Sequence, residues 1–298
     1  MKIRIAVSPS VSALHEDVFP EYLEECERLG FDTVWLSDIP LGALGDPLLS
    51  LTFAAARTSR MKLGANIVPL GRHPLWLAKQ LAQLDRLSNG RLLISFVPGL
   101  GHATERLALG YPTENRGRVV DEMIDLMRQW WSGQAVTTNW QGLEFQNVKL
   151  ELRPVQEPLE VWLGGISAAA LERVATLADG WLTSAATPAE AGAARLVIER
   201  RARELGRIVD PEHFGISMPF CLEEPPEEAL AALRVRRKDR DLSKVVAVGA
   251  QSLSGLMSEH IDQGLSKFVV RPLSAMSADN RWREELNWLA DAVLDLQT

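Results

Sequence analysis

The stretch His73–Gly101, HPLWLAKQLAQLDRLSNGRLLISFVPGLG, contains the repeating unit of the fold. Its first half predicts a helix with one apolar face, because leucines recur at steps of three and four residues. These leucines are Leu77, Leu81, Leu84 and Leu87. Asn89-Gly90 ends the helix, since both residues tolerate the left-handed conformation. The apolar run at 92–97 is typical of a parallel strand covered on both faces.

The same alternation of apolar strands and amphipathic helices continues toward both ends of the chain. We predict the other seven strands at 3–8, 33–37, 61–68, 160–165, 180–184, 214–220 and 267–272. Eight such repeats in 298 residues predict an α/β protein with one (β/α)8 (TIM) barrel domain over residues 1–298. An open, doubly wound sheet is the alternative. Residues 134–150 alternate in polarity around Gln141-Gly142 and predict a small hairpin inserted after the fourth helix.

Composition and charge argue against a nucleic-acid-binding, membrane-spanning or secreted protein. The net charge of -7 argues against a nucleic-acid partner, which usually meets a basic face. No apolar run approaches the roughly 20 residues that span a bilayer, and the first ten residues predict a strand rather than a secretion signal. Cys26 and Cys221 are expected to be free buried thiols in a cytoplasmic protein. No histidine or cysteine has a partner at metal-ligand spacing, so we expect no metal.

A (β/α)8 barrel places its ligand site at the carboxyl ends of its strands. Asp38 follows the second predicted strand, Asn66 lies near the end of the third, and Gly99 opens a glycine-rich loop after the fourth. The turn at 164–167, Gly-Gly-Ile-Ser, ends the fifth strand and opens a helix. Such a turn favours an anion, because its N–H groups are exposed and the helix dipole is positive there. A tight turn in which Ser167 caps the helix is the alternative.

The chain resembles the bacterial luciferase-like monooxygenases, together with the deazaflavin F420-dependent oxidoreductases of the same superfamily. The resemblance rests on VWLSD at 34–38, LDRLSNGR at 84–91 and VWLGGISAAALERVATLADGW at 161–181, in the family's order along almost the whole chain. LDRLSNGR leads from a helix end into a strand start, on the face of the barrel opposite the site. We therefore expect it to serve stability, with Asp85 and Arg91 as a buried ion pair.

The resemblance implies which residues hold a cofactor. Gly164, Gly165, Ile166 and Ser167 would contact its phosphate, and Gly99 and Gly101 would form a loop beside it. Asn66 and Ile67 would form a bulge with a non-proline cis peptide bond that supports the ring system. Asp38 would approach the same ring as a binding or catalytic acid.

The remaining candidates concern catalysis and the substrate. His102 follows the glycine loop and is the candidate proton donor, because imidazole titrates near neutral pH. It stands where family members often carry an acidic residue, and Glu105 lies further on. Ile39 follows Asp38 where F420 dehydrogenases often carry a catalytic histidine. Ile39, Thr183 and Arg271 are expected to line the substrate pocket.

The resemblance therefore implies an oxidoreductase that uses coenzyme F420 for hydride transfer to or from a small organic substrate. The alternative is an FMN-dependent monooxygenase that uses reduced flavin and O2, with a flavin reductase as partner. A non-catalytic flavin-binding protein is the second alternative, because Ile39 departs from the F420 dehydrogenase pattern. A homodimer is expected, since many family members are dimers or larger.

Overall fold

The computed structural model describes residues 1–10, 12–99, 103–111, 114–225, 227–236, 241–273 and 281–298. Eight strands of the described chain form the main sheet: β1 (Arg4–Val7), β2 (Thr33–Ser37), β3 (Lys62–Ile67), β4 (Leu92–Phe96), β7 (Val161–Leu163), β8 (Gly180–Ser184), β9 (Phe214–Cys221) and β11 (Lys267–Pro272). They are hydrogen-bonded in the order β9-β11-β1-β2-β3-β4-β7-β8, and an additional pairing of β8 with β9 closes the series. The predicted (β/α)8 barrel is thus confirmed. β10 (Ala247–Val248) adds a short strand beside β9.

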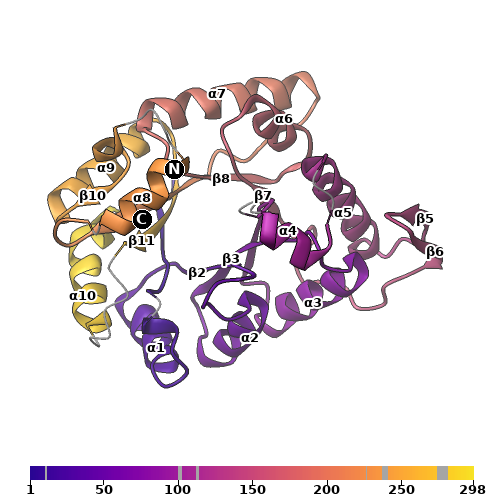
Figure 1. Cartoon of the computed structure of the whole chain (residues 1–298), viewed down its shortest axis with the longest axis horizontal. Coiled ribbons are helices and arrows are strands. Elements are labelled where there is room, and N and C mark those ends of the chain that lie inside the picture. The colour runs from indigo at the N-terminus through magenta and orange to yellow at the C-terminus, as the bar shows by residue number, and fades with distance from the viewer. Residues whose placement is uncertain (11, 100–102, 112–113, 226, 237–240, 274–280) are drawn as a thin grey trace. The chain divides into compact units, whose positions relative to one another are not determined.

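Helices follow the strands, as Figure 1 shows. They are α1 (Phe19–Leu29), α2 (Pro47–Arg57), α3 (Pro74–Leu87), α4 (Ala103–Leu109), α5 (Arg116–Trp131), α6 (Ala168–Leu177), α7 (Pro188–Glu204), α8 (Glu227–Arg236), α9 (Ala250–Asp262) and α10 (Trp282–Val293). None of the helices in the described ranges has the length and apolarity needed to cross a membrane. Two compact units make up the chain: residues 1–36, 60–62 and 162–298 form one, and residues 37–59 and 63–161 form the other.

In the first unit, α1 packs against α10, α9 packs against α7 and α10, and α6 lies beside α7. The rings of Tyr22 and Trp282 meet edge to face with centroids 5.7 Å apart and join α1 to α10. The ammonium of Lys267, at the start of β11, is buried beside the carboxylate of Asp32 and the hydroxyl of Thr33. A buried charge needs such partners, because leaving water costs it several kcal/mol.

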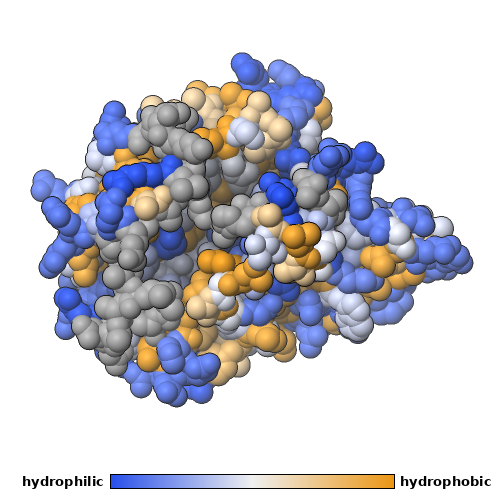
Figure 2. All heavy atoms as spheres, viewed as in Figure 1, coloured by the Kyte–Doolittle hydropathy of each residue, from blue (hydrophilic) through white to orange (hydrophobic). Residues whose placement is uncertain are grey.

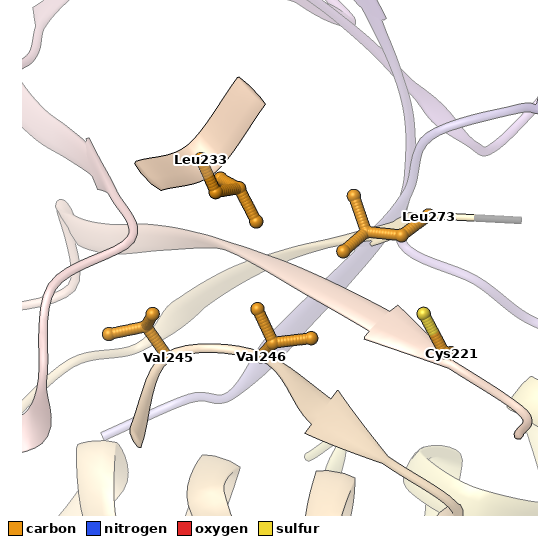
Figure 3. Packing of buried hydrophobic residues seen from close by; sticks show 5 residues of the cluster. All are labelled: Cys221, Leu233, Val245, Val246 and Leu273. Atoms are coloured by element: carbon orange, nitrogen blue, oxygen red, sulfur yellow. The ribbon is translucent and has the colours of Figure 1, made fainter. Parts of the chain in front are cut away.

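A small hydrophobic cluster lies at the ends of β9 and β11 in the same unit (Figure 3). Leu233 reaches down from α8, and Cys221 and Leu273 lie at the two strand ends. Val245 and Val246 complete the cluster from the segment before β10. Cys221 and Cys26 are both free and buried, as predicted.

In the second unit, α3 packs against α2 on one side and α5 on the other. The indole N–H of Trp131 on α5 donates to the carbonyl of Ala78 on α3, at 2.9 Å. The predicted hairpin is confirmed as β5 (Val136–Trp140) and β6 (Leu143–Val148), joined by a turn at Gln141 and Gly142. It extends away from α5 (Figure 1), and its surface is largely hydrophilic (Figure 2). Phe145 anchors it against Trp130, with ring centroids 5.2 Å apart.

The prediction that Asp85 and Arg91 form a buried ion pair is wrong. The fully buried Asp85 carboxylate accepts hydrogen bonds from the backbone N–H groups of Val155 and Gln156, at 2.6 and 2.9 Å, and from the Gln156 amide. Arg91 instead donates to the hydroxyl of Thr58 and to nearby carbonyls. These three N–H donors stabilise the carboxylate without a cationic partner. They can do so because a hydrogen bond to an ionised group is stronger than one between two neutral groups. The motif serves stability, as expected, by tying α3 to the segment before β7.

Candidate functional site

Asp38, at the end of β2, belongs to an ion network in the second unit that is centred on Arg72. Oδ2 of Asp38 accepts a hydrogen bond from the N–H of Val68 at 3.0 Å and another from Nη2 of Arg72 at 2.9 Å. The same Nη2 donates to Oδ2 of Asp46 at 2.9 Å. Burial disfavours the charge on Arg72, but the two carboxylates prevail and raise its pKa above the ordinary value. Arg72 therefore stays charged and holds the loops after β2 and β3 together.

A cavity of about 250 Å³ lies beside this network. Asp38, Asp46 and Arg72 form its polar wall. Apolar side chains from the loops after β2 and β3 and from the end of α4 form the rest: Ile39, Pro40, Leu44, Val68, Leu70 and Leu109. The structure thus brings two of the predicted site residues, Asp38 and Ile39, to one cavity.

The end of β3 is regular, which corrects one expectation. The Asn66–Ile67 peptide bond is trans, since Glu157–Pro158 is the one cis bond in the described ranges. The physical reason is the ladder with β4, in which Asn66 lies opposite Ser95 and Ile67 opposite Phe96 without a bulge. The Ile67 side chain is fully buried, so only its backbone is available to a ligand.

Ser95 is a polar residue that sequence reasoning missed. It lies opposite Asn66 in the parallel ladder, so both side chains share one face of the sheet. Asn66 is partly exposed, whereas the Ser95 hydroxyl is fully buried and has no hydrogen-bond partner in the described structure. The only sequence signal was a hydroxyl within the apolar run LLISF.

A second set of contacts that the sequence did not reveal lies after β4, around Glu105. Glu105, on α4, is buried and accepts a hydrogen bond from the hydroxyl of Tyr111 at 3.2 Å. Gly99 lies so close that a Cβ atom there would be 2.6 Å from Oε1 of Glu105. Burial and the neighbouring carboxylate raise the pKa of Tyr111 above its ordinary value. The other predicted residues of this loop, Gly101 and His102, lie outside the described residues.

The glycine turn after β7 lies in the first unit. A Cβ atom at Gly164 would lie 2.5 Å from the carbonyl oxygen of Leu182, so β8 requires glycine there. Gly165 has a φ of +96°, which side chains rarely adopt. Its carbonyl accepts a hydrogen bond from the indole of Trp181 at 2.9 Å. The turn is therefore held rigidly against β8.

The start of α6 is open to ligands. Ser167 is the N-cap, and its hydroxyl accepts from the N–H of Ala170 at 3.3 Å, as the structural alternative expected. The N–H groups of Ala168 and Ala169 have no acceptor among the described residues. No acidic residue stands in the first turn of the helix, and Ile166 is exposed. Free N–H groups without a nearby carboxylate suit an anion.

The last two predicted residues also lie in the first unit. Thr183 on β8 is buried, with only 2% of its surface exposed. Arg271 lies near the end of β11, opposite Pro219 of β9, and is half-buried. The predicted site residues thus divide between the units. Asp38, Ile39, Asn66, Ile67 and Gly99 belong to one, and Gly164, Gly165, Ile166, Ser167, Thr183 and Arg271 belong to the other.

Similarity to solved structures agrees with this fold. The chain superposes over its full length on an F420-dependent secondary alcohol dehydrogenase in complex with an F420–acetone adduct, with a TM-score of 0.82 and 17% identity; all of that chain is covered. The chain also superposes over its full length on the oxygenating constituent of 3,6-diketocamphane monooxygenase from Pseudomonas putida in complex with FMN. Here the TM-score is 0.80, the identity is 15%, and 99% of that chain is covered. At such low identity these likenesses show the fold alone.

Sequence comparisons place the chain more narrowly. It is 29% identical over 231 residues to limonene 1,2-monooxygenase of Rhodococcus erythropolis, which covers 74% of this chain. The chain spans 59% of the length of that relative. The family model described as luciferase-like monooxygenase matches residues 5–279. The chain therefore belongs to the luciferase-like monooxygenase family, whose members are oxidoreductases and monooxygenases.

Proposed function

We propose that this protein is an oxidoreductase that uses coenzyme F420 for hydride transfer to or from a small organic substrate. The observation that carries the proposal is the open turn at Gly164–Ser167, which leads into the N-terminus of α6. Its shape and its free N–H groups suit the phosphate of such a cofactor. Family membership supports the redox class of reaction.

The described residues fit a cofactor with a phosphate. Gly164 and Gly165 keep side chains away from the turn, and the N–H groups of Ala168 and Ala169 remain available to an anion. When bound, F420 would supply a hydride donor or acceptor, while the chain binds and orients the reactants. In the other unit, Asp38 and Ile39 line a cavity that can take a small molecule.

A second candidate is an FMN-dependent monooxygenase that receives reduced flavin from a partner reductase. The relationship to limonene 1,2-monooxygenase favours it. A third is a flavin-binding protein without turnover. Ile39 favours the third, because an aliphatic side chain cannot transfer a proton where F420 dehydrogenases often carry histidine.

A binding titration separates these candidates. The purified chain is titrated with F420, with FMN, and with the phosphate-free core of each, followed by fluorescence. We expect F420 to bind more tightly than FMN, and each cofactor to bind on the order of 10-fold more tightly than its phosphate-free core. Preference for FMN would support the monooxygenase, and binding without turnover of any substrate would support the flavin-binding protein. If neither cofactor binds, the proposed function is withdrawn.

The phosphate position is tested at Ile166, which is exposed and has no special backbone conformation. Ile166→Asp adds a negative charge to the turn, and Ile166→Asn adds a side chain of nearly the same shape without charge. We expect the Asp variant to bind the cofactor at least about 10-fold more weakly than the Asn variant, because like charges repel. Equal affinities would place the phosphate elsewhere.

A further inference from the structure

Two of the residues that line the cavity, Arg72 and Asp38, have hydrogen-bonding atoms without a partner among the described residues. Nε of Arg72 donates to the carbonyl of Val68 at 3.2 Å, and Nη2 donates to both Asp38 and Asp46. Nη1 of Arg72 has no acceptor among the described residues. Both hydrogen bonds to the Asp38 carboxylate fall on Oδ2, so Oδ1 is left without a donor from the described residues. Two residues that line the cavity therefore keep one donor and one acceptor without a partner among the described residues.

The charges on the cavity wall favour a neutral ligand. Two carboxylates and one guanidinium stand there, so an anion would meet an excess of negative charge. A cation cannot accept a hydrogen bond from the Arg72 guanidinium, which carries a charge of the same sign. A carbonyl or hydroxyl oxygen suits that donor and needs no countercharge.

The rest of the cavity sets the size and apolarity of the ligand. Its volume is about 250 Å³, which is the volume of about eight water molecules at about 30 Å³ each. A ligand of roughly ten non-hydrogen atoms would fill it. Leu44, Leu70 and Leu109 provide aliphatic walls. An apolar ligand body gains free energy by covering such surface.

We propose that this cavity is the substrate site, and that it takes a small neutral molecule with an apolar body and one carbonyl or hydroxyl oxygen. The identification of this ligand as the substrate rests on the proposed function, whereas its binding does not. The loops after β2 and β3 form most of the cavity, and barrel enzymes recognise substrates through such loops. Nη1 of Arg72 would donate to the ligand oxygen, and Oδ1 of Asp38 would accept from a hydroxyl.

The test uses three related probes and two tryptophan variants. The probes are 4-isopropylcyclohexanone, isopropylcyclohexane without the oxygen, and the anion 4-isopropylcyclohexanecarboxylate. Leu44→Trp fills the cavity from a partly exposed loop position, so the fold is expected to tolerate it. Leu49→Trp is the matched control, because Leu49 is 74% exposed on α2 and does not line the cavity. Affinities are measured by calorimetry on the cofactor-free protein, and thermal midpoints confirm that each variant folds.

We expect the ketone to bind the unmodified chain and Leu49→Trp equally, and Leu44→Trp at least 10-fold more weakly. The hydrocarbon and the carboxylate are each expected to bind at least 10-fold more weakly than the ketone. Equal affinity of folded Leu44→Trp, tighter binding of the carboxylate, or no binding of the ketone would overturn the proposal. If the ketone binds as expected but no cofactor does, the ligand site stands and the proposed function fails.

Discussion

Nη2 of Arg72 lies 2.9 Å from Oδ2 of Asp38, a residue 34 positions earlier in the chain. The same nitrogen reaches Asp46, which also caps α2 through its Oδ1. The Asp38 side chain is only 5% exposed, so removal of its partner leaves a nearly buried charge. The network therefore connects the stability of two loops to the shape of the cavity.

Arg72→Gln should lower the free energy of unfolding by roughly 2 kcal/mol, measured by urea denaturation. This is less than the roughly 3–5 kcal/mol typical of a broken buried pair, because Arg72 is about a quarter exposed. Asp46→Asn is the matched control: its oxygen can still cap α2, whereas its amide NH2 can no longer accept the hydrogen bond from Arg72. We expect it to cost well under half as much. A larger loss in the control would show that Asp46, rather than Asp38, is the main partner.

His260 should make stability depend on pH. It is fully buried on α9, neither ring nitrogen has a partner among the described residues, and burial lowers its pKa from 6.5 to about 4. The pKa of His260 is lower in the folded protein than in the unfolded chain, so the unfolded chain binds the proton first as the pH falls. The fold therefore has its full stability only while the pH is above the pKa of the unfolded chain. That stability is lost as the pH falls from about 6.5 toward 4, by up to roughly 3 kcal/mol. His260→Leu should remove this slope in urea midpoints measured between pH 7.5 and 4.5. Parallel curves for the two proteins would contradict the assignment.

The two tyrosines of the chain should resist ionisation while the protein is folded. Burial, with the neighbouring Cys26 as a lesser cause, raises the pKa of Tyr22 well above 10. Burial and Glu105 raise the pKa of Tyr111. An acid with a raised folded pKa destabilises the fold once the pH exceeds its unfolded value. We therefore expect phenolate absorbance at alkaline pH to rise together with the loss of circular dichroism. A separate absorbance step near pH 10 in folded protein would argue against burial of one ring.

Lys267→Met should strongly destabilise the first unit. Lys267 is 4% exposed and its ammonium contacts Asp32 and Thr33. The variant therefore leaves the Asp32 carboxylate, whose side chain is 14% exposed, without its main partner. The expected loss is about 3 kcal/mol, the lower end for broken buried pairs. Arg281→Met is the control, because Arg281 and Glu284 form an exposed pair at 3.1 Å. Its denaturation midpoint should stay unchanged; equal effects of both variants would mean that the buried pair has no special role.

Local patterns in the sequence determined most of the elements. The leucine spacing before Asn89-Gly90 predicted α3, and Gln141-Gly142 predicted the turn of the hairpin. Each of these signals acts between residues at most a few positions apart. The alternation of strands and helices then leaves few topologies, so the barrel also followed from the sequence.

Only the tertiary structure decided which side chains meet. Asp85 binds Gln156, 71 residues away, rather than the nearby Arg91, and Arg72 joins Asp38 to Asp46 across two loops. Glu105 lies against Gly99, and Ser95 shares a face with Asn66. A charged side chain takes whichever partners the packed elements bring within hydrogen-bond distance, and no local pattern records that choice. For this reason the barrel could be read from the sequence, whereas the cavity and its ion network required the fold.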